Sequence, residues 1–267
     1  MPRLDPQPAV PGAEFVSRTP GACHDLEPLF ADLDWPRPLI EAVLEGEAGW
    51  ALAGAGPGPA AAGLRVQVFT ILGGDPGSAD ADRLIDALPG DHFAIGSVPW
   101  RAAIRTRRGR GVEAWYWVPF DSSRLEAEHL RRLAASAHAA YEIVPLDGQL
   151  LPHLWPDLAV PSPQHGFRSD AELLERGFGF CAVTRGQVVS AALSFTRSRR
   201  SVEVQINTHQ EHRHRGLGTA VCAALVLRCL DEGLAPHWSA ANRRSEGLAE
   251  KLGFVAETRR EVLYLTK

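Results

Sequence analysis

The stretch HQEHRHRGLGTAVCAALVLRCLDEGLAPHW, residues 209–238, decides how the second half of the chain is interpreted. Basic and imidazole side chains fill residues 212–215, and Gly216-Leu217-Gly218 follows them. From Thr219 to Glu232 nearly every residue is Ala, Val, Leu or Cys, which predicts a helix buried on all sides. The chain therefore sets positive charge and two glycines directly in front of a core helix.

The start of this helix is suited to an anion. The first four N–H groups of an α-helix lack intrahelical partners, and the helix dipole adds about half a positive charge there. Gly216 and Gly218 carry no Cβ atom that would hold a phosphate away from those amides. Arg213 and Arg215 can donate charge-assisted hydrogen bonds. These features predict a loop that binds a phosphate or pyrophosphate.

Three types of phosphate loop can be compared with this one. A Walker loop needs a lysine after its last glycine, where Thr219 stands. A dinucleotide fingerprint needs a small residue where Val221 stands, and an acidic residue about 20 positions later, where Ala and Trp stand. The third pattern, Gln/Arg-x-x-Gly-x-Gly/Ala, fits residues 213–218 without a mismatch.

This third pattern resembles the acetyl-CoA pyrophosphate loop of the GNAT acetyltransferases. Its surroundings strengthen the resemblance: a polar strand ending in NTH precedes the loop, and the buried helix and the strand PHWSAA follow it. Asn242-x-x-Ser245-x-x-Leu248-x-x-x-x-Gly253-Phe254 is similar to the family's second helix. The run from GFGFCAV through KLGF resembles the subgroup related to zwittermicin-resistance acetyltransferases. The resemblance covers about residues 139–267.

The resemblance implies acetyl-CoA as the co-substrate and no metal. The pantetheine arm would lie between the strand ending at His209 and the strand at 237–241, which splay apart. One backbone N–H near this arm would polarise the thioester carbonyl. The residues implied to contact acetyl-CoA are Ile206, Thr208, Arg213, His214, Arg215, Gly216, Leu217, Gly218, Thr219 and Asn242.

Transfer to an amine also needs proton movements, because the amine is protonated near neutral pH. Glu203, on the strand before the loop, is the candidate base, and the alternative is an exposed strand carboxylate. Asn207 departs from several relatives, which carry an acid there. Ala249 stands where many members carry a tyrosine acid. Ser245 and Tyr264 are candidate substitutes, and the thiolate leaving unassisted is the third option.

The order of predicted elements indicates an α/β (α+β) protein. Residues 139–267 are expected to form a GNAT-like mixed central sheet flanked by helices. Residues 1–138 are expected to form a smaller α+β domain, with a degenerate GNAT-like half that shapes the substrate cleft as one interpretation. Within it we predict strands over 64–74, 102–107 and 112–120, a helix over 78–88 capped by Ser78, and a helix over 122–140 capped by Ser122 or Ser123.

Composition limits the class of protein. The chain has 267 residues and a net charge of -4, which argues against a dedicated nucleic-acid binder. The start shows no signal peptide, and no apolar run approaches the roughly 20 residues of a membrane span. Four cysteines without paired spacing fit a reducing compartment, so a soluble, cytoplasmic protein is expected. His209, His212 and His214 lack a completing Cys or acid for a metal site.

We therefore expect an N-acetyltransferase that moves the acetyl group of acetyl-CoA to a primary amine of a small molecule, by direct attack in a ternary complex. An acyl-cysteine route is disfavoured because Cys181, Cys222 and Cys229 lie in apolar segments. The alternative is a non-catalytic module that binds CoA or acetyl-CoA for regulation. No nucleic-acid or membrane partner is expected. The identity of the amine and the oligomeric state stay open.

Overall fold

The computed structural model describes residues 15–18, 23–54, 58–160 and 163–267. By their contacts the residues divide into two units: unit 1, Met1–Trp117 with Arg260–Lys267, and unit 2, Val118–Arg259. The sequence placed a boundary between residues 138 and 139, whereas this division falls within one long strand. The last eight residues join unit 1 because their strand pairs there, a long-range pairing that leaves no local sequence signal.

Unit 1 is built on a sheet in the order β1-β2-β3-β4-β5-β13-β6. All neighbouring strands are antiparallel except β4 and β5. Its elements are β1 (Phe15–Arg18), the 3-10 helix η1 (His24–Phe30), α1 (Arg37–Leu44), β2 (Trp50–Gly54), β3 (Ala61–Val66), β4 (Phe69–Gly74), α2 (Ala79–Ala87), β5 (His92–Ile95), α3 (Val98–Arg108), β6 (Val112–Asp121, shared with unit 2) and β13 (Arg260–Leu265).

Local signals in unit 1 predicted some elements correctly and others wrongly. The strand predicted over 112–120 is confirmed as β6. The helix predicted from Ser78 is confirmed as α2, and the Ser78 hydroxyl accepts the Ala81 N–H at 3.2 Å. The strand predicted over 102–107 is wrong: these residues belong to α3, which buries Trp100 and Ile104 four residues apart. The single strand over 64–74 is also wrong, because Gln67 turns the chain with φ of 52° between β3 and β4.

Unit 2 contains the mixed sheet that was expected, in the order β6-β11-β10-β9-β8-β7, with β12 also paired to β6. Only β10 and β11 run parallel. Its further elements are α4 (Ala127–Ala134), β7 (Glu142–Pro145), α5 (Leu151–Asp157), α6 (Asp170–Arg176), β8 (Gly179–Thr184), β9 (Gln187–Arg197), β10 (Ser201–Thr208), the 3-10 helix η2 (Gln210–His212), α7 (Leu217–Asp231), β11 (Ala235–Ala240), α8 (Arg243–Leu252) and β12 (Val255–Ala256).

The helix expected over 122–140 is shorter than predicted. It begins after Glu126, and neither candidate serine caps it. Ser123 instead binds Asp121 at the end of β6, with its backbone N–H 2.9 Å from the carboxylate. Helix α5 was not predicted at all, because Pro152 and Pro156 obscure its pattern.

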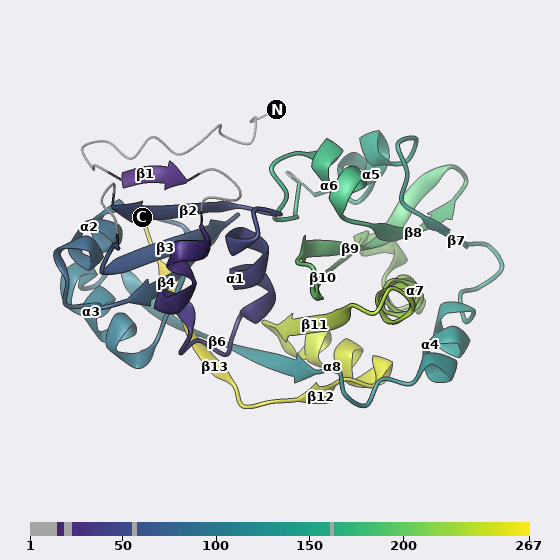
Figure 1. Cartoon of the computed structure of the whole chain (residues 1–267). Coiled ribbons are helices and arrows are strands. Elements are labelled where there is room, and N and C mark those ends of the chain that lie inside the picture. The colour runs from purple at the N-terminus through teal and green to yellow at the C-terminus, as the bar shows by residue number, and fades with distance from the viewer. Residues whose placement is uncertain (1–14, 19–22, 55–57, 161–162) are drawn as a thin grey trace. The chain divides into compact units, whose positions relative to one another are not determined.

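Helices cover both faces of the unit 2 sheet (Figure 1). On one face α7, with α4 and α8, encloses a core that includes Val202, Val204 and Val221. On the opposite face α5 and α6 pack over Cys181 and Leu193. Helix α7 is therefore the buried helix that the apolar run predicted.

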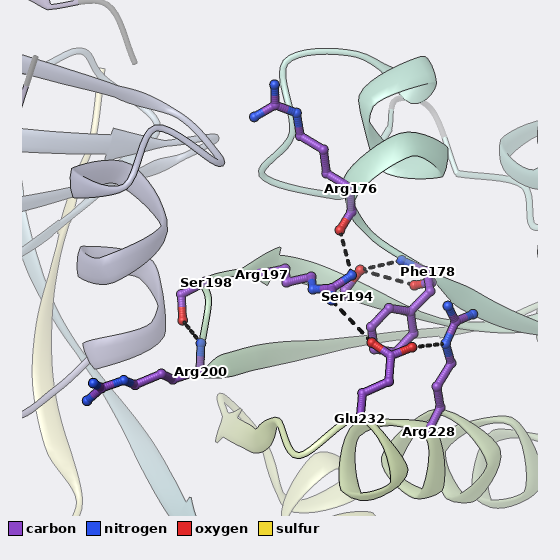
Figure 2. Close-up of polar contacts among 8 residues, drawn as sticks. All are labelled: Arg176, Phe178, Ser194, Arg197, Ser198, Arg200, Arg228 and Glu232. Atoms are coloured by element: carbon purple, nitrogen blue, oxygen red, sulfur yellow. Dashed lines mark hydrogen bonds and ion pairs between the residues drawn. The ribbon is translucent and has the colours of Figure 1, made fainter. Parts of the chain in front are cut away.

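An ionic cluster fastens the far end of α7 to the sheet (Figure 2). Glu232 accepts hydrogen bonds from Arg197 at 3.2 Å and from Arg228 at 2.7 Å. Arg228 also lies 4.4 Å from the ring centroid of Phe178. A second bond from Arg197 reaches the Arg176 carbonyl at 3.1 Å, so β9, α6 and α7 meet at this cluster.

Unit 1 contains a buried histidine whose titration makes stability depend on pH. His92 is 2% exposed and its Nε2 lies 2.7 Å from the Thr70 hydroxyl. Burial, with repulsion from Arg65, lowers the pKa of His92 to about 3. Between that value and the unfolded pKa of 6.5, only the unfolded chain binds the proton, so stability falls as the pH falls.

We predict that the free energy of unfolding falls by about 2 kcal/mol less between pH 7 and pH 5 in His92→Gln than in the native chain. Urea unfolding at both pH values measures it. The control His153→Gln changes an exposed histidine on α5 and should keep the native pH dependence. Equal pH dependence in His92→Gln and the native chain would contradict the assignment.

Candidate functional site

The parallel pairing of β10 and β11 is short. It joins three residue pairs, the last of them Glu203 with His237. From Trp238 onward the recorded partner of β11 is β6, while β10 continues along β9 to Thr208. Within the described residues, the edge of β10 from Val204 onward therefore has no strand paired to it on the β11 side. This is the splayed edge at which the sequence placed the pantetheine arm.

Helix α7 begins beside this edge. Gly216 is its N-cap with φ of 78°, a left-handed conformation that favours glycine, and no side chain caps the helix. The first turn contains no acidic residue. A Cβ on Gly218 would lie 3.4 Å from the Thr208 hydroxyl and 3.8 Å from Ile206, which are ordinary contacts. Packing within the protein therefore does not require glycine at 218.

The loop before α7 is held by its own arginines. Arg213 Nε donates to the Thr208 carbonyl at 3.2 Å. Arg215 donates to the Tyr141 hydroxyl at 2.9 Å and to the Glu211 carbonyl at 3.3 Å. Both arginines are exposed, so their remaining N–H groups can reach an anion from solvent.

The other loop residues divide between fold and surface. His214 is exposed and adopts φ of 61°, which re-aims the chain before Gly216. Leu217 and Thr219 are buried in the first turn of α7, so only their backbone can serve a ligand. Desolvation, with repulsion from Arg215, lowers the pKa of His212, which disfavours the charged form of this side chain.

Glu203 is buried where β10 and β11 separate. Its side chain is 7% exposed, so the alternative of an exposed strand carboxylate is wrong. Desolvation raises the pKa of Glu203 to about 7, while hydrogen bonds from the Ser239 side chain and backbone act in the opposite direction. A carboxyl group with this pKa exchanges its proton near neutral pH, as a general base or acid requires.

Two of the residues proposed near the leaving group, Asn242 and Ser245, lie at the start of α8. Asn242 is the N-cap, and its side-chain oxygen accepts the Ser245 N–H at 3.1 Å, which leaves its NH₂ to donate. The Ser245 hydroxyl accepts the Trp238 indole N–H at 2.9 Å, so its own hydrogen is left to donate. Ala249 is fully buried, and Tyr264 belongs to unit 1, where it contacts Asp91.

Cysteine chemistry is disfavoured by burial. Desolvation raises the pKa of Cys181 and of Cys229 to about 12 and raises the pKa of Cys222 still further. Thiols this weakly acidic are poor nucleophiles. In the described ranges, no group of three or more His, Cys, Asp or Glu side chains is arranged to hold a metal ion. None of the helices described is long and apolar enough to cross a membrane.

Comparison with known proteins identifies the family of the chain. The model of the family described as GNAT acetyltransferase matches residues 27–263. The chain belongs to the GNAT acetyltransferase family. The match starts more than 100 residues before 139, so the family resemblance extends well beyond residues 139–267, over which the sequence motifs indicated it.

Individual GNAT relatives show the same likeness. A stretch of 102 residues is 33% identical to the uncharacterized N-acetyltransferase YdfB of Bacillus subtilis (strain 168), and spans 37% of this chain and 38% of that protein. The structure of a GCN5-related N-acetyltransferase-like protein from Streptococcus suis 89/1591 is 26% identical, covers 90% of this chain and 96% of its own, and has a TM-score of 0.77.

A more distant neighbour shows the fold alone. It is described as a tandem GNAT protein from the clavulanic acid biosynthesis pathway, with 16% identity, a TM-score of 0.57 and coverage of 94% of this chain and 97% of its own.

Two residues of this candidate site were not predicted from the sequence. Tyr141 precedes β7, far from the loop in sequence, yet its hydroxyl lies 3.3 Å from His212 Nδ1 and accepts from Arg215. Ser239 lies on β11 and bonds to Glu203. Neither residue belongs to a motif, but the alternation of PHWSAA could have put Ser239 on the same face as His237, the register partner of Glu203.

We predict that Gly218→Asp abolishes CoA binding without unfolding the protein, because a carboxylate would occupy the anion site at the start of α7. Calorimetric titration of CoA measures the affinity, and circular dichroism checks the fold. The matched control Gly247→Asp adds the same charge at an open position of α8 and should bind CoA like the native chain. Retained affinity in Gly218→Asp would contradict the assignment of this loop.

We also predict that Ser239→Ala raises the pKa of Glu203 further by about one unit, because the carboxylate loses a hydrogen bond that favours its charged form. Carboxyl ¹³C NMR titration of protein labelled at glutamate measures the change. Ser239→Thr keeps the hydroxyl and should titrate like the native chain. An unchanged pKa in Ser239→Ala would show that the serine does not bear on Glu203.

Proposed function

We propose that the protein transfers the acetyl group of acetyl-CoA to a primary amine of a small molecule, by direct attack within a ternary complex. One observation carries the proposal: a buried carboxyl group whose desolvation raises its pKa to about 7, Glu203, lies where β10 parts from β11. A proton acceptor and an unpaired strand edge thus share one strand. Family membership supports acetyl-CoA as the co-substrate.

The pyrophosphate of acetyl-CoA is bound by the first turn of α7 and by Arg213 and Arg215. The uncapped N–H groups of the helix and the two guanidinium groups supply donors, and Gly218 lets a phosphate approach the backbone. The pantetheine arm pairs with the open edge of β10 around Ile206 and Thr208 and accepts a bond from the Asn242 side chain. These roles are the ones that the family resemblance implied.

In the reaction Glu203 accepts a proton from the ammonium group of the acceptor. The free amine nitrogen attacks the thioester carbonyl, a backbone N–H of the open β10 edge stabilises the developing oxyanion, and the C–S bond breaks to release CoA as a thiolate. The amide nitrogen then loses its second proton to solvent. The Ser245 hydroxyl, whose hydrogen is free to donate, is the candidate partner of the leaving sulfur.

The second candidate function is that of a module that binds CoA and catalyses no reaction. Ala249 in place of the usual tyrosine favours it, because the family's common acid is missing. Such a module would bind acetyl-CoA and acetylate no amine. We favour the enzyme because a regulatory module gains nothing from a buried carboxyl group, which costs stability when it ionises.

The proposal extends to partners and subgroup. The acceptor is a small molecule rather than a nucleic acid or a membrane component, and the protein acts in the cytoplasm. Within the family it is grouped with the zwittermicin-resistance-like acetyltransferases on the strength of the run from Gly177 to Phe254.

We predict that Glu203→Gln lowers turnover at pH 7 by at least 100-fold with little change in acetyl-CoA affinity, because loss of a general base costs about 10²–10⁴ in rate. In the native chain, turnover should rise with pH through about 7 as Glu203 ionises. Release of CoA thiol over a panel of primary amines measures turnover, and calorimetry measures affinity.

The control Glu250→Gln, at an exposed position of α8, should leave turnover unchanged. Thermal unfolding at pH 9 checks the fold. Glu203→Gln should be more stable there by up to about 3 kcal/mol, because the ionised buried carboxylate opposes folding above its folded pKa of about 7. Unchanged turnover in Glu203→Gln would remove this residue as the base.

A further inference from the structure

Three carboxamide side chains meet on unit 2. Gln205 and Asn207 project from β10, and Gln164 comes from the connection between α5 and α6. Gln205 Nε2 and Asn207 Nδ2 each donate to Gln164 Oε1 at 3.1 Å. All three side chains are half-buried, and no other hydrogen bond of theirs is recorded in the described part of the chain. We call these residues the carboxamide trio.

The trio lies on the same face of the sheet as the candidate base. Val202 and Val204 point into the core beneath α7. Since side chains alternate along a strand, Glu203, Gln205 and Asn207 project together from the opposite face. Successive residues on one face of a strand are about 7 Å apart, so the Cα atom of Gln205 lies about 7 Å from that of Glu203.

The loop that carries Gln164 is fixed by its neighbours rather than by the trio alone. In the pairing of β9 with β10, the register shifts between Glu203 and Val204, which leaves Phe195 as an extra residue of β9. The Phe195 carbonyl accepts the Gly166 N–H at 2.6 Å. His165, which is fully buried, bonds Asp170 at 2.8 Å. These contacts of its neighbours therefore fix the position of Gln164 beside β10.

The trio carries no charge, and it can both donate and accept hydrogen bonds. With Gln164 Oε1 accepting twice, its NH₂ group remains as a donor, and the oxygens of Gln205 and Asn207 remain as acceptors. Flipping all three amides reverses the roles but again leaves both donors and acceptors. The trio itself offers no charge to balance a second charge on a ligand, and a charge that loses water without a counter-charge is costly.

We propose that the carboxamide trio selects the acceptor, and that the acceptor carries an uncharged hydrogen-bonding group, a carboxamide or a hydroxyl, close to its reactive amine. This inference rests on the proposed acetyl transfer and adds the class of amine. Glu203 takes the proton from the amine, and the trio binds the neighbouring neutral group. Amines with a second cation, a carboxylate or only alkyl groups at that place are poorer acceptors.

Four amines of nearly one shape test the class: glycinamide, isobutylamine, glycine and glycinamidine. They differ in the group beside the aminomethyl carbon, which is a neutral amide, an alkyl group, an anion or a cation. We compare kcat/KM at saturating acetyl-CoA, corrected for the fraction of free amine. Glycinamide should exceed each of the others at least tenfold, and a native enzyme without this preference would overturn the proposal.

Variants assign the preference to the trio. Gln205→Leu and Asn207→Leu should each cut the ratio of kcat/KM for glycinamide to kcat/KM for isobutylamine about tenfold, while the affinity for acetyl-CoA stays near its native value. The matched control Gln187→Leu, at an exposed position of β9, should keep the native preference. A preference that survives in both trio variants would overturn the proposal.

A charge change separates recognition from structural support. Asn207→Asp should move the preference towards glycinamidine, because the new carboxylate matches the amidinium group. If the role of Asn207 were purely structural, Asn207→Asp would lower kcat/KM for all four amines by the same factor. That result would also overturn the proposal.

A measurement of binding distinguishes failure of this proposal from failure of the proposed acetyl transfer. Saturation-transfer NMR of glycinamide on the CoA-bound protein needs no turnover. If no amine is acetylated, the proposed function fails, yet contact with glycinamide that is lost in Asn207→Leu would still support the trio as a ligand site. Equal contact in the native chain and in Asn207→Leu would overturn it.

Discussion

The early end of the parallel pairing between β10 and β11 is the constraint on which the rest of the site depends. Three residue pairs join the two strands, and then β11 turns to β6 while β10 continues along β9. A strand edge inside a sheet normally satisfies its backbone groups with its neighbour. Among the described residues that edge has no strand partner, and helix α7 starts beside it with an uncapped first turn that contains no acidic residue. We propose that the open edge and the helix start are two parts of one binding surface.

The burial of Glu203 has a cost in stability. A carboxyl group that is 7% exposed destabilises the fold once it ionises, and hydrogen bonds from Ser239 lower its pKa only in part. Hydrophobic contacts of α7 on one face of the sheet, and of α5 and α6 on the other, stabilise the fold and offset this cost. The β9 bulge at the same point frees the Phe195 carbonyl to brace the loop of Gln164. The residues proposed to accept the proton and to recognise the acceptor therefore lie on one short stretch of sheet.

Several local signals in the sequence predicted their elements correctly. Ser78 caps the helix expected from it, and the apolar run after Gly218 is the core helix. Prediction failed where the decision was tertiary. The strand expected over 102–107 became a helix because Trp100 and Ile104 face a core that no local pattern reveals, and β13 joined unit 1 through long-range pairing. For the site, the loop motif located the helix start, but the burial of Glu203 and the meeting of Gln164 with β10 depend on packing between distant segments.

Calorimetric titration of CoA and of pantetheine into the same protein tests the central claim most directly. The two ligands share the arm that pairs with β10, and only CoA carries the pyrophosphate assigned to residues 213–218. We predict that CoA binds at least 100-fold more tightly than pantetheine and that this difference shrinks as salt is added, because charge-assisted bonds and the helix dipole provide it. Equal affinity for the two ligands, or no binding of CoA, would contradict the account.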